Sequence, residues 1–166
     1  MKIYMALTCK VGAYNRVLKE LLDLHIPLDV FVLYGPIDIL VQFTGFESLT
    51  EFIEKGFNPV KMIGADEGLI TKTMTLIVIS EGPSFLGEPF AFLFFNTQPR
   101  HLERVQQDLL KIPEVISADT VFGPYDIICS VRAKDKDDFE RVAQYIYDHV
   151  PTIEGSITSI IALIRI

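Results

Sequence analysis

A short stretch of this 166-residue chain occurs twice at a fixed separation. The segment from Val32 to Leu40 returns as the segment from Thr120 to Ile128, and the glycine and the aspartate of each copy keep step (123 − 35 = 88 and 126 − 38 = 88). The same spacing holds upstream, where three apolar residues precede their counterparts without a gap: Val17 and Val105, Leu21 and Leu109, Leu22 and Leu110. A period this long indicates two folded units rather than a solenoid of short repeats.

The repeat also covers the ends of the two halves. Residues 70–79 lie over residues 157–166 at a spacing of 87. Between the halves, residues 80–89 contain two glycines and two prolines, a composition that suits neither helix nor strand. The sequence therefore predicts a first domain at 1–79, a linker at 80–89 and a second domain at 90–166.

Hydrophobic periodicity predicts the same order of elements in both halves. In the first half we expect strands at 3–8, 28–34, 37–44 and 70–79, a helix near 14–23, a short helix from Glu47 closed by Gly56, and a loop at 58–68. In the second half we expect strands at 90–96 and 156–166, a hairpin at 115–131, and helices at 99–111 and 135–149. The order strand, helix, strand, strand, helix, strand is that of a ferredoxin-like α+β unit.

The predicted strands are apolar on both faces. Phe90, Phe92 and Phe94 alternate with Ala91, Leu93 and Phe95, so neither side of the sheet suits water. We therefore expect the two sheets to pack face to face, within one chain or between chains, as in dimeric α/β barrels. Exposing either face would leave a large apolar patch, which predicts oligomerisation.

Charge and hydropathy exclude some classes of partner. The net charge is −7 and the predicted pI is about 4.9, without a Lys/Arg cluster, which argues against direct nucleic-acid binding. The longest apolar run, 90–95, is far below the roughly 18 residues that span a bilayer, so we expect no membrane association and a cytoplasmic location. Cys9 and Cys129 form no CxxC pair and are interpreted as structural thiols.

The second half resembles the ligand-binding (RAM) domain of the Lrp/AsnC, or feast/famine, transcription regulators. The resemblance depends on Ile112-Pro113-Glu114-Val115, on Gly123-Pro124-Tyr125-Asp126, and on Val150-Pro151 followed by Gly155 and Thr158. The first half is similar to a diverged copy, in which Ile37 replaces the tyrosine and Thr71-Lys72-Thr73 keeps the T-x-T of the last strand. The chain enters its first strand at Ile3, which leaves no room for the helix-turn-helix domain of these regulators.

The resemblance implies a regulatory protein, not an enzyme, that senses a small-molecule effector, with an amino acid favoured. It would act through homo-oligomers or through a helix-turn-helix regulator, and it implies no cofactor and no metal. Glycine lets a ligand approach the backbone, an aspartate accepts from an ammonium group, and threonine hydroxyls hold a carboxylate. The implied ligand-binding residues are Gly123, Tyr125, Asp126 and Thr158, with Gly35, Asp38, Thr71 and Thr73 from the first half.

Other interpretations stay open at this point. Gly-Pro followed by an apolar run also makes a tight hairpin, and an aspartate beside a turn often bonds local backbone N–H groups. An oligomerisation or adaptor module without a ligand is one alternative, and an ACT domain shares the order of elements. A dimeric α/β-barrel enzyme is another, although His25, His101 and His149 are scattered and no catalytic motif is present.

Overall fold

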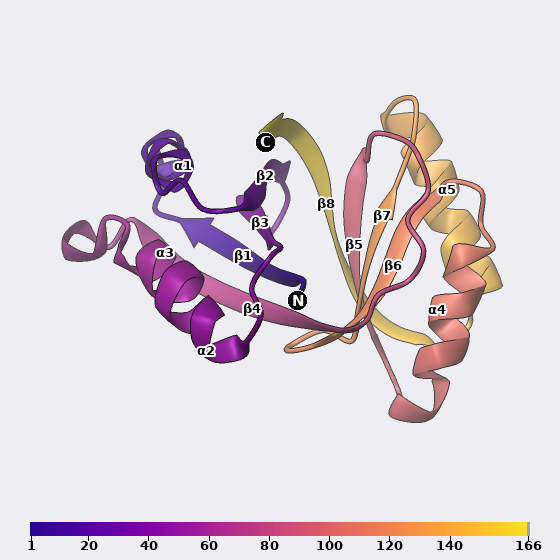
Figure 1. Ribbon diagram of the computed structural model, residues 1–166. Helices are drawn as coiled ribbons and strands as arrows, with labels where there is room; N and C mark the ends of the chain where they lie inside the picture. Colours follow the sequence, from indigo (N-terminus) through magenta and orange to yellow (C-terminus); the bar gives the residue numbers. More distant parts are fainter. Residues whose placement is uncertain (166) are drawn as a thin grey trace. The chain divides into compact units, whose positions relative to one another are not determined.

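The computed structural model describes residues 1–165, except for the side chains of 157–160 and 162–165. The chain divides into two compact units, one of residues 1–77 with the segment that begins at Ala162, and one of residues 78–161. Each unit is a mixed α+β structure with an antiparallel sheet and helices on one of its faces (Figure 1).

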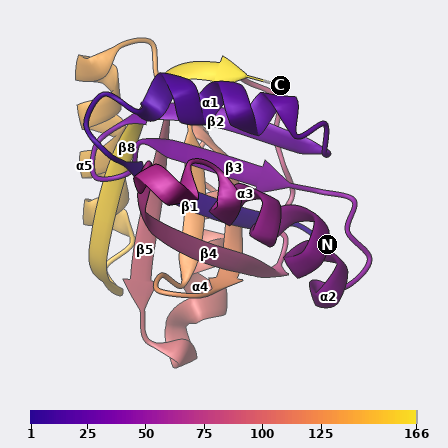
Figure 2. The same cartoon turned by 90° about the vertical axis from the view of Figure 1, so that its left-hand side faces the viewer.

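The first unit is built on four antiparallel strands in the order β4-β1-β3-β2. Figure 2 brings this unit forward, with α1, α2 and α3 on one face of the strands. Its elements are β1 (Ile3–Cys9), α1 (Tyr14–Asp23), β2 (Leu28–Tyr34), β3 (Ile39–Phe43), α2 (Leu49–Phe52), the π-helix η1 (Ile53–Phe57), α3 (Asn58–Met62), the 3-10 helix η2 (Ala65–Glu67) and β4 (Ile70–Ser80).

The second unit repeats this arrangement with the strand order β8-β5-β7-β6, again antiparallel. Its helices α4 and α5 lie on one face of the strands (Figure 1). Its elements are β5 (Ala91–Thr97), the 3-10 helix η3 (Pro99–His101), α4 (Leu102–Leu110), β6 (Val115–Phe122), β7 (Ile127–Val131), α5 (Lys136–His149) and β8 (Ile153–Arg165).

The central strands β1 and β5 are buried on both faces, as the two-sided apolar pattern predicts. In β1, Met5 and Leu7 belong to the core that faces the helices, while Tyr4 is 2% exposed and points to the opposite face. In β5, Leu93 and Phe95 face the helices, and Phe94 on the other face is also fully buried. The packing of one sheet against the other stays a prediction.

The segment after the first hairpin is more helical than the sequence indicates. Gly56 does not close a helix, and most of the predicted loop is structured as α3 and η2. The π-helical turn η1 connects α2 to α3. Pro59, near the start of α3, has no N–H for the i→i−4 hydrogen bond of an α-helix. A Cβ on Gly56 would lie 2.9 Å from the Phe52 ring and 3.1 Å from the Phe46 ring, so glycine is there for close packing.

The predicted linker packs on the second unit. The N–H of Gly82 donates to the Asp119 carboxylate at 3.1 Å, and the N–H of Phe85 donates to the Ile116 carbonyl at 2.9 Å. Arg132 reaches over to the Leu86 carbonyl at 3.2 Å. The segment therefore lacks regular secondary structure but is held along β6 by defined hydrogen bonds.

Candidate functional site

The two hairpin turns have the same unusual backbone at their glycines. Gly35 has a φ of 143° and Gly123 a φ of 155°, a backbone conformation that residues other than glycine rarely adopt. Each glycine precedes an exposed proline and follows an exposed aromatic residue, Tyr34 or Phe122. The predicted role of both glycines in ligand approach is untested, but a structural need for glycine is evident at each turn.

The two predicted aspartates make equivalent hydrogen bonds. In the first unit, Oδ2 of Asp38 accepts from the N–H of Cys9 at 2.7 Å. In the second unit, Oδ2 of Asp126 accepts from the N–H of Thr97 at 3.0 Å and from the Asn96 amide at 3.4 Å. Cys9 and Thr97 are themselves 88 residues apart, so the repeat preserves the partner as well as the aspartate.

These bonds lie at an irregularity in the sheet. The register of β1 with β4 shifts between Thr8 and Cys9, and the register of β5 with β8 shifts between Asn96 and Thr97. A bulge interrupts the ladder and leaves a backbone group in need of a partner. Each aspartate therefore has a local structural role, and any contact with a ligand would come in addition to it.

The Asp38 carboxylate also affects a neighbouring thiol. Burial raises the pKa of Cys9 to about 11, and the negative charge of Asp38 adds to this effect. The thiol is therefore protonated at neutral pH and is a poor nucleophile. Burial likewise raises the pKa of the Cys129 thiol, with Asp119 contributing. The two cysteines do not form a disulfide, and both are free thiols.

Tyr125 lies beside Asp126 and is half-buried. Its ring packs on Phe94, with 5.7 Å between centroids and 58° between planes. The equivalent residue of the first unit, Ile37, is buried at 4% exposure. The tyrosine ring is therefore part of an aromatic contact, on the side of β5 that faces away from the helices.

The predicted threonines of the first unit have different hydrogen-bond partners. The Thr71 hydroxyl donates to the Thr8 carbonyl at 3.1 Å, so Thr71 and Asp38 flank the end of β1 from its two neighbouring strands. Thr73 instead accepts from Nζ of Lys61 at 3.3 Å, on the helix side. The Thr158 side chain lies outside the described residues, and its backbone pairs with Leu93.

A groove beside the first hairpin includes one of the predicted residues. It has a volume of about 350 Å³ between α1 and β2. Its lining residues are Tyr14, Asn15, Leu18, Val32, Leu33, Tyr34 and Asp38. Tyr14, at the start of α1, is 44% exposed. Tyr34 is 71% exposed before the Gly-Pro turn, and its position in the sequence is the signal that could have located this groove.

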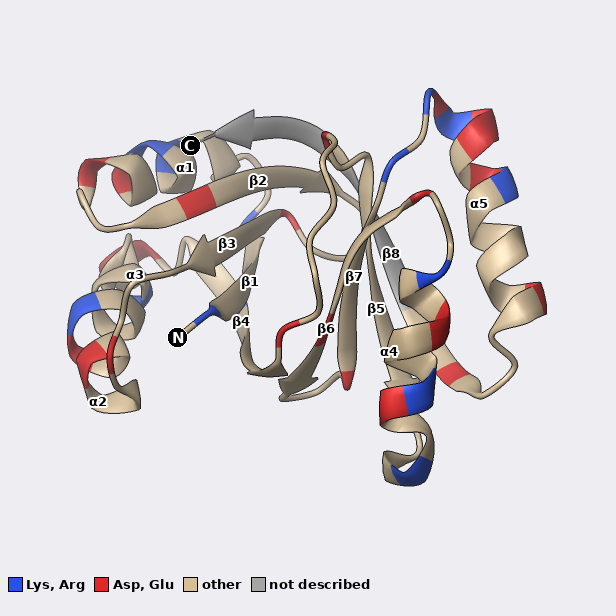
Figure 3. Ribbon diagram, turned by 45° about the vertical axis from the view of Figure 1, so that its right-hand side comes forward, with Lys and Arg blue, Asp and Glu red and all other residues tan. Residues whose placement is uncertain are grey.

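Charged residues of both signs alternate along the helices, whereas the strands are largely uncharged (Figure 3). Within residues 1–165, no cluster of His, Cys, Asp and Glu side chains has the arrangement of a metal site. In that same part of the chain, no helix has both the length and the apolar character needed to cross a bilayer.

Each unit therefore has a Gly-Pro turn followed by an aspartate that accepts from a backbone N–H. Residues 90–163 match the sequence profile of the Lrp/AsnC ligand binding domain. The second half of the chain therefore carries such a domain. The match covers the hairpin with Gly123, Tyr125 and Asp126, and it ends before the last residues of β8.

The chain is also homologous to a transcriptional regulator. Over 100 residues, or 60% of this chain, it is 31% identical to the HTH-type transcriptional regulator PH0140 of Pyrococcus horikoshii. The match spans 61% of that regulator's length.

Two solved structures show the fold over nearly the whole chain. The siroheme decarboxylase NirDL is 7% identical, with a TM-score of 0.65 over 99% of this chain and 72% of its own. An anthrone oxidase-like protein is 12% identical, with a TM-score of 0.59 over 99% of this chain and 91% of its own. At these identities the likeness concerns the fold alone.

Proposed function

We propose that this chain is a regulatory protein built from tandem RAM-like domains that senses a small molecule, with an amino acid as the favoured effector. The match of residues 90–163 to a ligand-binding domain carries the proposal. The chain would act by changing its own oligomers or by associating with a helix-turn-helix regulator. An enzymatic role has less support, because the domain that residues 90–163 match is a ligand-binding one.

The chemistry of the second hairpin supports an amino-acid effector. One oxygen of the Asp126 carboxylate is fixed by the Thr97 N–H, and the carboxylate's charge suits an α-ammonium group. The neighbouring Asn96 amide, which donates to the Pro124 carbonyl at 3.1 Å, holds the turn against β5. Gly123 leaves the backbone open for close approach of a ligand.

Isothermal titration calorimetry with the twenty amino acids tests this proposal. We expect one of them to bind the intact chain, and we expect Asp126→Asn to weaken binding by about tenfold, because a charge-assisted hydrogen bond becomes a neutral one. The asparagine retains an acceptor for the Thr97 N–H, so the fold should survive. Asp38→Asn is the matched control in the diverged first half, where we expect a smaller change.

The absence of binding by every amino acid would count against the sensor. If the chain then still formed mixed oligomers with a purified full-length Lrp/AsnC regulator, the adaptor role would replace it.

A further inference from the structure

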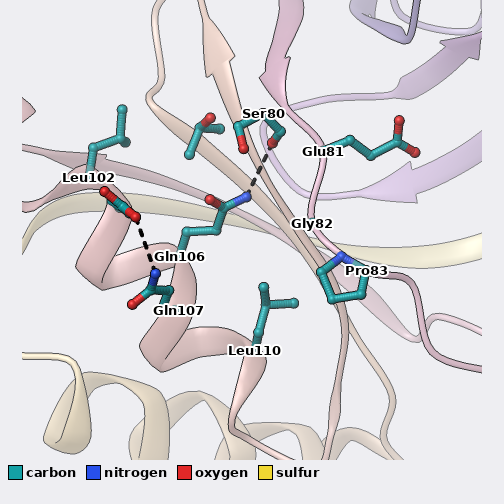
Figure 4. A pocket seen from close by; sticks show the side chains of 10 residues that line it. Ser80, Glu81, Gly82, Pro83, Leu102, Gln106, Gln107 and Leu110 are labelled. Carbon is teal, nitrogen blue, oxygen red and sulfur yellow. Dashed lines mark hydrogen bonds between the residues drawn. The ribbon is translucent and has the colours of Figure 1, made fainter.

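The second unit has a groove at the position that corresponds to the α1–β2 groove of the first. It lies between α4, β6 and the segment Ser80–Pro83, with a volume of about 460 Å³ (Figure 4). Four lining positions are counterparts at the 88-residue spacing: Tyr14 and Leu102, Asn15 and Glu103, Leu18 and Gln106, Val32 and Thr120. The repeat therefore provides an internal comparison of the same groove with two linings.

The comparison shows a change of chemistry in the wall of the groove. Leu18 and Val32 of the first unit are replaced by Gln106 and Thr120 in the second. Gln106 is 7% exposed and Thr120 is 4% exposed, so both polar side chains are buried. A buried polar group without a hydrogen bond is costly, so two such replacements in one wall need an explanation.

The existing hydrogen bonds satisfy only part of these two side chains. Nε2 of Gln106 donates to the Ser80 carbonyl at 3.1 Å and to the Ala118 carbonyl at 2.9 Å. Figure 4 shows this side chain between α4 and the segment at Ser80. Within the part of the chain that the structure describes, neither Oε1 of Gln106 nor the Thr120 hydroxyl has a hydrogen-bond partner.

The remaining lining residues indicate the charge of a ligand. Glu103 lies at the groove where the first unit has Asn15, and no lysine or arginine is among the described lining residues of the groove. Apolar atoms come from Leu102, Leu110 and Pro83. The volume lies within the roughly 300–1,000 Å³ of small-molecule sites.

We propose that this groove binds a small aliphatic amine, at a site separate from the hairpin. The protonated amine donates to Oε1 of Gln106, to the Thr120 hydroxyl and to the Glu103 carboxylate, and its carbon chain lies on Leu102 and Leu110. An ammonium group has three donors and no acceptor, which matches these three acceptors. A carboxylate on the ligand would meet the Glu103 carboxylate, so an amine fits better than an amino acid.

Calorimetry with n-butylamine and 1,4-diaminobutane on the intact chain tests the proposal, with n-butanol and butyrate as uncharged and anionic controls. We expect the amines to bind and the controls not to bind. Thr120→Val and Glu103→Asn introduce the residues that the first unit has at the equivalent positions, Val32 and Asn15, so the fold should tolerate them. We expect each to weaken amine binding about five- to tenfold, which corresponds to the loss of one hydrogen bond.

The hairpin variant Asp126→Asn separates this site from the effector site of the proposed function. We expect it to leave amine binding unchanged, and we expect Thr120→Val to leave amino-acid binding unchanged. Amine binding that is lost in Asp126→Asn, or retained at full strength in both groove variants, would overturn the proposal. So would the failure of both amines to bind at millimolar concentration to wild-type chain whose cooperative thermal unfolding shows it to be folded.

Discussion

At the scale of single residues, the aspartates after the two hairpin turns have a clear structural task. Asp38 and Asp126 each accept from a backbone N–H at the irregular end of a central strand. Both residues are predicted from the sequence as ligand contacts, with local backbone bonding as the alternative. The structure shows the local bonding, so a test of ligand binding must separate charge from hydrogen-bonding capacity.

We expect Asp126→Ala to lower the free energy of unfolding by about 1–3 kcal/mol, because the Thr97 N–H loses its partner. We expect Asp126→Asn to cost less, since the amide oxygen can accept the same bond. Urea denaturation of the two variants measures the difference. Equal and small losses in both would show that the bond contributes nothing to stability.

The raised pKa of Cys9 predicts a pH dependence of both reactivity and stability. The folded thiol has a pKa of about 11 against an ordinary 9.0, so the folded state binds this proton more tightly than the unfolded state does. Stability from this source is complete below pH 9 and is lost as the pH rises towards 11. Alkylation of Cys9 by iodoacetamide, followed by mass spectrometry, should have its midpoint near pH 11.

Asp38→Asn should lower that midpoint, because the carboxylate charge is one cause of the shift. Cys129 is buried, and its thiol should stay unmodified until the chain unfolds. A midpoint near 9.0 in the wild-type chain would contradict the assigned environment of Cys9.

The hairpin glycines predict a second effect on stability. Gly123→Ala places a side chain at a φ of 155°, and we expect a loss of about 1–3 kcal/mol in the free energy of unfolding. Gly155→Ala is the matched control, because its Cβ would meet Asn96 at an ordinary distance of 3.8 Å. Thermal unfolding followed by circular dichroism distinguishes the two, and equal melting temperatures would contradict the backbone argument.

At the scale of elements, the predicted helices at 14–23, 99–111 and 135–149 agree with the structure to within three residues at both ends, and only the end at Gly56 was wrong. Ser48 and Asp135 cap α2 and α5, accepting from the N–H groups of Glu51 and Asp138 at 3.1 and 2.8 Å. These caps are local, so a short sequence pattern suffices to predict them. The continuation past Gly56 was missed because glycine commonly ends a helix, whereas here it allows close packing against the Phe46 and Phe52 rings.

The cap of α5 gives an element-scale prediction. Asp135→Ala should lower the free energy of unfolding by about 1 kcal/mol, because the Asp138 N–H loses its side-chain acceptor. Asp137→Ala, at an exposed position in the first turn of the same helix, is the control for a simple loss of negative charge. Similar losses in the two variants would show that the charge near the helix start matters more than the cap.

At the scale of the whole molecule, the repeat gives each unit an exposed aromatic residue at the tip of its hairpin. Tyr34 is 71% exposed and Phe122 is 69% exposed, at positions 88 residues apart. Large exposed aromatic side chains are common in protein interfaces and contribute much of their binding energy. These tips are therefore candidates for self-association, one of the two routes in the proposed function.

We expect analytical ultracentrifugation to give a mass at least twice that of one chain, which is 18.8 kDa. We expect the double substitution Tyr34→Ser and Phe122→Ser to reduce this mass. Leu86→Ser, at a residue that is 94% exposed in the linker, is the control for a general loss of surface hydrophobicity. A wild-type mass of 18.8 kDa at all concentrations would exclude self-association under those conditions.

The sequence by itself determined the period of the repeat, the order of elements in each half and the turns at Gly35 and Gly123. These features depend on local alternation and on backbone preferences, which a single sequence displays. Only the tertiary structure decided that Asp126 bonds the N–H of Thr97, 29 residues away, and that Gln106 and Thr120 face one groove. Such contacts join segments far apart in the chain, and packing rather than local pattern selects them.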